Sequence, residues 1–270
     1  MLAAYGLPAT PAEPGVTRYV RYRLKTGAPA WGVLEGESIR KITGDLFGDH
    51  KPAGSPIKLA DVKLLAPAEP PKIFAVGLNY RSHLGNRPAP ANPEIFYKPI
   101  TSLQDPGGPI VIPKSALNVH YEAEFVLVIG KLTKNVTPAQ AKASIFGVTC
   151  GNDVSERDWQ NGESKDLQWW RAKGADTFAP CGPMLVRGLD DSKLLLQGRL
   201  NGEVVQKQYI SDLLFDSAAI VSFISQAVTL QPGDLIYTGT PGTTRKMKPG
   251  DVFEVELDGV GILKNPVVAA

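Results

Sequence analysis

The sequence has little of what marks several large classes of protein. Its 270 residues include only two cysteines and three histidines, and the formal net charge is +2. A chain with so small a net charge and no basic run gives no sign of binding nucleic acid or an anionic membrane. No apolar run approaches the roughly 20 residues of a membrane-spanning helix. We therefore expect neither nucleic acid nor a membrane as a partner.

The few cysteines and the N-terminus bear on the compartment. Cys150 and Cys181 do not form a cluster with the spacing of a metal site. The N-terminus shows no basic start followed by an apolar core, so no signal peptide is evident. In a chain without a leader, two reduced thiols are favoured, although a disulfide between the two cysteines stays open. The expected location is the cytoplasm.

Glycine and proline are frequent, whereas long helical periodicities are scarce. The chain has 27 glycines and 23 prolines, and this composition favours a β-rich protein with many loops. Short strands are predicted in the first part of the chain, over residues 16–24, 30–34 and 38–42. The proline-rich stretch 67–71 then reads as a stiff linker. We predict a small β-rich N-terminal domain over residues 1–66, with an irregular start over residues 1–15, and a second domain over residues 67–270.

Residues 121–130 are the stretch around which the second domain is organised. After Glu124 the run is apolar and β-branched and ends at a glycine, which predicts a buried strand. Glu122 and Glu124 are two positions apart, so on a strand both carboxylates project from one face, with Cα atoms roughly 6.6 Å apart. Such a pair resists burial unless a hard divalent cation neutralises it. The alternative is the solvated end of an edge strand, because exposed glutamates are common.

Other polar residues lie near predicted strand ends, and each has a structural alternative. A strand over residues 145–150 leads to Asp153, which also fits a turn or a helix cap. If the chain turns helical there, Arg157 and Gln160 share one face with Asp153. A strand over residues 72–76 leads to His83, although a lone histidine is more often structural than catalytic.

The segment that follows His83 also contains candidate residues. Residues 84–93 hold three prolines and a glycine and predict an irregular loop, which is a candidate lid. Lys98 follows among the apolar residues 95–99, where the alternative is a lysine that extends to the surface. These residues become functional candidates only in combination.

Helices and hairpins are predicted by local patterns. Thr137, Pro138 and Gln140 have the signature of a helix start, and a short helix to about residue 145 follows. Asn201-Gly202 and Asp258-Gly259 predict hairpin turns. A longer amphipathic helix is predicted over residues 216–228, with its buried face formed by Ile220, Phe223, Ile224, Ala227 and Val228.

Several segments, taken in order, resemble the fumarylacetoacetate hydrolase family, and in particular its bacterial members similar to 2-hydroxyhepta-2,4-diene-1,7-dioate isomerase. The matching segments are GLNYRSH (77–83), IFYKP (95–99), YEAEFVLVIG (121–130), GNDVSERDWQ (151–160), RAKGADTF (171–178), LNGEVV (200–205), QPGDLIYTGTPG (231–242) and GVGILKNPV (259–267). They cover nearly all of the chain after the linker. The resemblance implies a mainly β, mixed α+β fold: a β-roll catalytic domain with a small β-rich N-terminal domain, in a homodimer.

The resemblance also implies a set of site residues. Glu122, Glu124 and Asp153 match the metal ligands of the family, and their oxygen donors favour Mg²⁺, with Mn²⁺ or Ca²⁺ as alternatives. The implied catalytic residues are His83, Lys173 and Lys98, and the implied substrate-binding residues are Arg157, Gln160 and Thr240.

One position departs from the family pattern. Many members carry a glutamate three residues after the histidine that matches His83, and here that position is Asn86. Asparagine can orient a water molecule, but it cannot serve as an anionic partner of the imidazole. The residue pair that activates water in the hydrolases is therefore incomplete, and Glu94 is the one nearby carboxylate that could replace it.

The expected chemistry is that of a 2-oxo acid held as a metal-chelated enolate. An octahedral cation with three protein carboxylates has about three further positions, and a 2-oxo acid can fill two of them. We expect a metal-dependent enzyme of catabolism, for example of aromatic compounds, with C–C bond cleavage favoured, as acylpyruvate hydrolysis or decarboxylation. Isomerisation or hydration of unsaturated 2-oxo or 2-hydroxy dioic acids is the alternative, and a non-catalytic 2-oxo acid binding protein is another.

Overall fold

The computed structural model describes residues 14–163 and 165–270, so most of the predicted irregular start lies outside the described residues. Within them, the largest sheet has 13 strands. Its main path runs through β4 (His50–Pro52), β3 (Ser38–Gly44), β2 (Ala30–Glu35), β1 (Thr17–Leu24), β15 (Ala179–Arg187), β13 (Ile145–Asn152), β12 (Ala123–Ile129), β18 (Leu235–Tyr237), β7 (Ile73–Gly77) and β8 (Glu94–Lys98). Three short strands pair beside this path, namely β5 (Ile57–Lys58), β6 (Val62–Leu65) and β9 (Leu103–Gln104).

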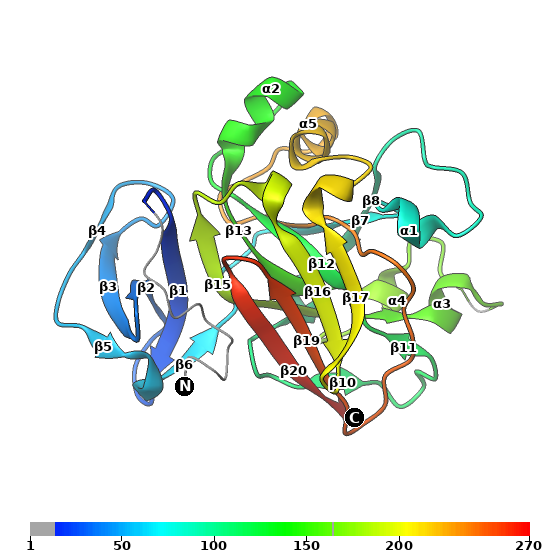
Figure 1. The fold of residues 1–270 in the computed structure, drawn as a ribbon, viewed down its shortest axis with the longest axis horizontal. Coiled ribbons are helices and arrows are strands. Elements are labelled where there is room, and N and C mark those ends of the chain that lie inside the picture. Colours follow the sequence, from blue (N-terminus) through cyan, green and yellow to red (C-terminus); the bar gives the residue numbers. More distant parts are fainter. Residues whose placement is uncertain (1–13, 164) are drawn as a thin grey trace.

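A second sheet packs against the first. Its five strands in the described chain are β10 (Ile110–Ile112), β20 (Gly261–Ala269), β19 (Val252–Leu257), β16 (Leu195–Leu200) and β17 (Glu203–Tyr209). Strands β16, β19 and β20 of this sheet pack against β12, β13 and β15 (Figure 1). A separate pair is formed by β11 (Val119–His120) and β14 (Ser155–Glu156). This arrangement confirms the predicted mainly β fold.

The helices of the described residues are short and lie outside the sheets. They are α1 (Arg81–Leu84), α2 (Pro138–Ala141), α3 (Arg157–Asn161), α4 (Trp170–Gly174) and α5 (Ser217–Ala227). Helices α2 and α5 pack together at the top of Figure 1. None of the helices in the described residues could span a membrane.

Strand β12 is buried on both faces, as its continuous apolar sequence predicts. Phe125 and Leu127 belong to the core between the two sheets, whereas Val126 and Val128 belong to the core on the other face. Its neighbours β13 and β18 both pair with it in the antiparallel direction. A strand without a solvated face has to be apolar at every position, and this explains the absence of alternation after Glu124.

The N-terminal strands are joined to the rest by strand pairing. Strand β1 pairs with β15, with Tyr19 opposite Leu185, so the left lobe of Figure 1 continues the large sheet. The proline-rich stretch 67–71 is not an exposed linker throughout, because Ala68 is buried. The domain boundary between residues 66 and 67 stays a prediction.

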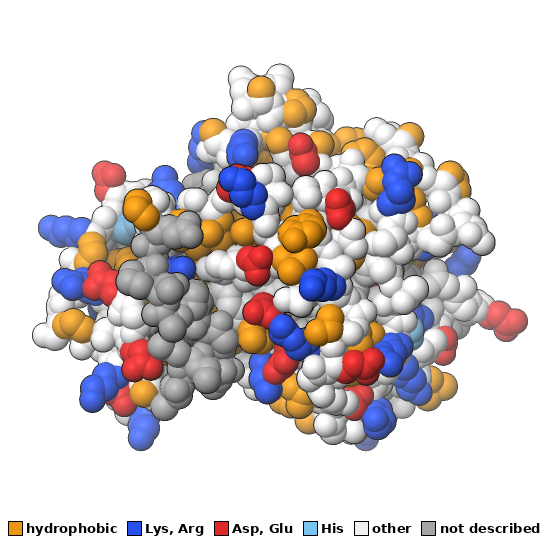
Figure 2. Space-filling view, viewed as in Figure 1, with side chains coloured by type: hydrophobic (Ala, Val, Ile, Leu, Met, Phe, Trp, Pro, Cys, Tyr) orange, Lys and Arg blue, Asp and Glu red, His pale blue; other side chains and the backbone are white. Residues whose placement is uncertain are grey.

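On the face shown in Figure 2, acidic and basic side chains are interspersed.

Several local predictions are confirmed. Thr137 and Gln140 form the expected capping box at the start of α2. The turns at Asn201-Gly202 and Asp258-Gly259 join the antiparallel pairs β16–β17 and β19–β20. Cys150 and Cys181 are buried free thiols.

The predicted buried face of α5 is partly wrong. Ile220 and Ile224 are buried as expected, but Phe223 is 40% exposed. The helix is turned so that Ser222 and Ser225 face the segment around Val136. The Ser222 hydroxyl donates to the Val136 carbonyl at 2.8 Å, and the Val136 N–H donates to the Ser225 hydroxyl at 3.1 Å. These hydrogen bonds satisfy backbone groups beside the helix, which an apolar face could not do.

Asn79, in the segment that resembles the family's lid motif, joins three parts of the chain. Its side chain is fully buried and donates to the carbonyls of Phe215 and Thr238 at 3.0 and 2.7 Å. Its Oδ1 accepts the Phe215 N–H at 2.8 Å. The chain between β7 and α1 is thereby attached to the end of β18, which fixes the base of the lid.

We expect Asn79→Ala to lower the free energy of unfolding by about 2 to 4 kcal/mol, because it leaves buried backbone groups without partners. Asn92→Ala is the matched control, since Asn92 is exposed in the loop before β8. Urea unfolding of both variants measures the difference. An equal, small effect of the two substitutions would show that the Asn79 hydrogen bonds do not stabilise the fold.

Candidate active site

Three carboxylates converge where β12 begins and β13 ends. Glu122 lies just before β12, Glu124 lies within it, and Asp153 directly follows β13. Because β12 and β13 pair antiparallel, with Ala123 opposite Asn152, the start of one strand meets the end of the other. One oxygen of each carboxylate lies within 4.8 Å of the others. The exposed fraction is 3% for Glu122 and 1% for both Glu124 and Asp153. The predicted pair of glutamates and Asp153 therefore form one buried cluster.

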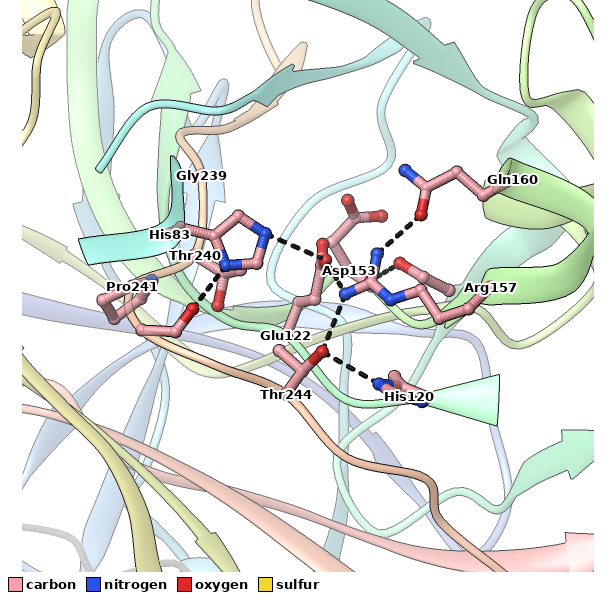
Figure 3. A network of polar contacts seen from close by, with 12 residues as sticks. His83, His120, Glu122, Asp153, Arg157, Gln160, Gly239, Thr240, Pro241 and Thr244 are labelled. Carbon is pink, nitrogen blue, oxygen red and sulfur yellow. Dashed lines mark hydrogen bonds and ion pairs between the residues drawn. The ribbon is translucent and has the colours of Figure 1, made fainter. Parts of the chain in front are cut away.

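Cationic side chains from three other elements reach this cluster. Lys173 of α4 places its Nζ 2.6 Å from both Glu122 Oε2 and Asp153 Oδ2. Lys98 of β8 places its Nζ 2.6 Å from Asp153 Oδ1. Arg157 of α3 forms an ion pair with Glu122. The polar network around Glu122 is drawn in Figure 3.

The cations are distributed unevenly over the carboxylates. Burial opposes the charged form of Glu122, but Arg157 and Lys173 hold its pKa well below the ordinary value. Burial and the nearby charges of Asp153 and Glu122 raise the pKa of Glu124 well above the ordinary value. Burial lowers the pKa of Lys98, whereas at Lys173 the charges of Asp153 and Glu122 outweigh burial and raise the pKa.

Glu124 is the carboxylate of the cluster whose negative charge is not paired with a cationic side chain of the described residues, so this charge is available to a metal ion. Its Oε2 accepts the Gly239 N–H at 2.7 Å, and it forms no ion pair within the described residues. Gly239 has φ +110°, and an added Cβ would lie 2.8 Å from Asn79 Cβ, so glycine is required there. A buried carboxylate with one neutral donor is poorly compensated, and a divalent cation would compensate it. The three carboxylates thus fit a metal ion bound through oxygen.

A cavity of about 370 Å³ opens on this cluster. Its lining includes most of the predicted site residues, namely His83, Glu122, Glu124, Arg157, Gln160, Lys173 and Thr240. An apolar part of the cavity wall is formed by Val76, Phe96 and Trp169. The side-chain oxygen of Gln160 accepts from Arg157 Nη1 at 2.6 Å. The Thr240 hydroxyl donates to the Ala123 carbonyl at 2.8 Å, so it also fixes the start of β12.

His83 is held with one ring nitrogen toward the cluster. Its Nδ1 lies 2.6 Å from the Gly242 carbonyl oxygen, and its Nε2 lies 3.9 Å from Glu122 Oε1. A carbonyl only accepts hydrogen bonds, so Nδ1 carries a proton and Nε2 is the ring nitrogen left to exchange one with a ligand. In Figure 3, His83 and Arg157 approach Glu122 from opposite sides.

Two expectations about the site are corrected. Lys98 does not line the cavity; its Nζ donates to Asp153 and to the Lys173 carbonyl, so it orients these groups from behind. Asp153 does not share a helix face with Arg157, because α3 begins only at Arg157. The backbone stays extended through β14, and Glu156 caps α3 by accepting the Trp159 N–H at 2.6 Å.

Sequence reasoning missed two residues that position Arg157. Arg157 Nη2 donates to the Thr244 hydroxyl at 2.9 Å, and His120 Nδ1 lies 2.9 Å from the same hydroxyl. His120 Nε2 lies 2.9 Å from Asn118 Oδ1. Burial and the Arg157 charge lower the pKa of His120 to about 4, so the ring is neutral. The only signal in the sequence was the closeness of His120 to Glu122.

The predicted lid loop is irregular over residues 85–93, as expected. Asn86 is exposed and is not among the residues that line the cavity. Glu94 lines a separate cavity beside Trp169 and Trp170 instead of the cavity at the carboxylate cluster. Glu94 is therefore not placed to replace the missing glutamate. The carboxylate nearest to His83 is Glu122, which corrects the expectation that the imidazole lacks an anionic neighbour.

Comparison with protein families gives two adjoining matches. The model described as fumarylacetoacetate (FAA) hydrolase C-terminal matches residues 72–268. A second model, described as Rv2993c-like, N-terminal, matches residues 17–67. All of the site residues described above fall within the first match.

Individual relatives carry several activities in their names. Oxaloacetate tautomerase fahd2, mitochondrial, of Xenopus laevis is 40% identical over 77% of this chain and 69% of its own length. The structure of 2-hydroxyhepta-2,4-diene-1,7-dioate isomerase from Mycobacterium marinum is 41% identical, with a TM-score of 0.86 over 94% of this chain and 98% of that one. Maleylpyruvate hydrolase from Sphingobium sp. SYK-6 is 28% identical, with a TM-score of 0.77 over 94% and 100%.

We expect the protein to bind Mg²⁺ or Mn²⁺, and Glu124→Gln to weaken this affinity by at least roughly tenfold, because one charge of the cluster is lost. Glu37→Gln, at an exposed position after β2, is the matched control. Calorimetric titration of metal-free protein measures the affinity without reference to activity. Equal affinities of wild type and Glu124→Gln would remove Glu124 from the metal site.

Proposed function

Because this chain belongs to the fumarylacetoacetate hydrolase family, we propose that it is a metal-dependent enzyme that interconverts the keto and enol forms of a 2-oxo acid. The single observation that carries the proposal is the orientation of His83. Its proton-bearing Nδ1 is fixed to the Gly242 carbonyl, and its Nε2 faces the carboxylate cluster. An imidazole fixed in one orientation beside a metal site is suited to moving one proton.

The carboxylates of Glu122, Glu124 and Asp153 would hold the metal ion. Mg²⁺ is the first choice for an all-oxygen donor set, with Mn²⁺ or Ca²⁺ as alternatives. When bound, the ion would polarise the 2-oxo carbonyl as a Lewis acid. The remaining chemistry belongs to the side chains of this chain.

His83 Nε2 would accept a proton from C3 of the keto form and pass it to the 2-oxo oxygen of the resulting enolate, which gives the enol; the reverse sequence returns the proton to C3. The Gly242 carbonyl keeps the ring in one tautomer and one orientation, so no reorganisation is needed before proton transfer. Interconversion requires nothing further of the lid, since no water is consumed.

Lys173 and Arg157 would place the reacting end of the substrate. Both line the cavity, and both are anchored to Glu122. Their positive charge favours a carboxylate and the negative charge that develops on the 2-oxo oxygen. Gln160, bonded to Arg157, holds the guanidinium from the other side. Lys98 supports Asp153 and would not touch the substrate.

C–C bond cleavage, which the sequence favoured, is the second candidate. Its support is the similarity to a maleylpyruvate hydrolase, at lower identity than the tautomerase and the isomerase. Hydrolysis needs an activated water, and the carboxylate nearest to His83 is Glu122, which also pairs with Arg157 and Lys173. A carboxylate so occupied is a poor partner for water activation.

Homodimer formation, the cytoplasmic location and the absence of nucleic-acid or membrane partners stay predictions.

We expect the protein with Mg²⁺ to accelerate the decay of enol oxaloacetate, followed by ultraviolet absorbance, and His83→Gln to lower kcat by about 10²- to 10⁴-fold. His50→Gln, in the N-terminal strands, should retain full activity. The same assay with acylpyruvates and unsaturated 2-oxo acids tests the alternatives. Binding of these acids without turnover of any would favour the non-catalytic alternative.

We expect wild-type hydrolysis of acylpyruvates to be much slower than keto–enol interconversion. Asn86 does not line the cavity in this structure, but it lies on the lid three residues after His83, so Asn86→Glu restores the glutamate of the family pattern and should raise hydrolysis alone when the lid covers the substrate. Glu94→Gln should change neither rate by more than about twofold, because Glu94 lies outside the cavity. Rates of both reactions in the three proteins provide the test. Fast hydrolysis in the wild type would show that no carboxylate on the lid is needed.

A further inference from the structure

Three permanently cationic side chains line the active-site cavity: Arg87, Arg157 and Lys173. Arg157 and Lys173 are both paired with carboxylates of the metal cluster. Arg87 has no carboxylate within ion-pair distance among the residues that the structure describes. The cavity therefore offers one cation whose charge is not used by the protein.

Arg87 is oriented by the short helix that carries His83. Its Nε donates to the Leu84 carbonyl at 3.2 Å, and its Nη2 lies 3.4 Å from the His83 carbonyl. Its backbone N–H also donates to the Leu84 carbonyl, at 3.1 Å. In the described chain, Nη1 has no hydrogen-bond partner. The guanidinium is thus fixed at the lid while some of its donors stay available to a ligand.

The charged residues of the cavity lining come from different segments of the chain. Glu122 and Glu124 are the carboxylates that line it, and both belong to the metal cluster. The other lining residues of the segment that carries Arg87, apart from His83, are Ser82, Leu84 and Gly85, and none of them is charged. A substrate with one carboxylate would use the cations of the cluster and leave Arg87 unmatched. A substrate with two carboxylates would use both.

We propose that Arg87 is the specificity-determining residue of this site and that it binds the second carboxylate of a 2-oxo dicarboxylic acid. The inference rests on the proposed function, since it assumes that the 2-oxo end of the substrate lies at the metal cluster. Arginine suits this role because its fork of donors matches a carboxylate in geometry as well as charge. Because the same segment carries His83, binding of the second carboxylate also holds the lid segment over the reacting carbon.

Matched ligands that differ only at the far end provide the test. For turnover these are oxaloacetate and 2-oxobutanoate, in which a terminal methyl group replaces the second carboxylate. For binding without turnover they are malate and 2-hydroxybutanoate, titrated by calorimetry into protein with Mg²⁺. The variants are Arg87→Gln and Arg87→Lys, with Arg81→Gln as the control, since Arg81 is an exposed residue of α1 that does not line the cavity.

We expect Arg87→Gln to lower kcat/KM for oxaloacetate and the affinity for malate by about 10- to 100-fold, the range for a hydrogen bond between charged groups. The values for the two monocarboxylates should stay within about twofold of wild type. Arg87→Lys should fall between wild type and Arg87→Gln, because charge is kept and the fork is lost. Arg81→Gln should match wild type for all four ligands.

Two results would overturn the inference. An equal loss for dicarboxylates and monocarboxylates would mean that Arg87 acts on the lid or on His83 in general. No loss for either would mean that Arg87 only covers the end of α1. If wild type turns over neither substrate but binds malate more tightly than 2-hydroxybutanoate in an Arg87-dependent way, the proposed function fails and the inference stands.

Discussion

The burial of three carboxylates at one strand junction is the constraint on which the active site depends. Acidic groups within 4.8 Å of one another and almost without solvent repel strongly, and their desolvation is costly. Lys98 from β8, Arg157 from α3 and Lys173 from α4 each supply compensating charge. These elements come from separate parts of the chain, so the charge balance of the cluster depends on contacts between distant segments.

Much of the fold could be predicted from the sequence because the deciding signals are local. The buried strand after Glu124, the capping box at Thr137 and the turn at Asn201-Gly202 each depend on a few adjacent residues. The two-residue period of a strand also places Glu122 and Glu124 on one side, so their closeness followed from spacing. Asp153 joined them only through the family resemblance, because nothing local shows that β13 lies beside β12.

The rest of the site depends on contacts between distant segments. Thr244 orients Arg157 across 87 positions of sequence, and the serines of α5 contact the segment near Val136 across more than 80. No periodicity encodes such partners, and for this reason the buried face of α5 was misassigned. Lys98 was expected at the substrate because it matches a family position; only the packing of β8 behind Asp153 shows that it supports the site.

The pairing of β1 with β15 has a consequence for how the chain folds during synthesis. Strand β1 leaves the ribosome well before β15, because Tyr19 precedes its partner Leu185 by 166 positions of sequence. Strand β6 already covers Arg21–Leu24 of β1 on that side, but until β15 arrives Thr17–Tyr19 present unpaired backbone groups to other chains. Contacts between such distant segments also form slowly, because a long loop has to close. The nascent chain is therefore most open to aggregation during the interval before β15 is added to the sheet.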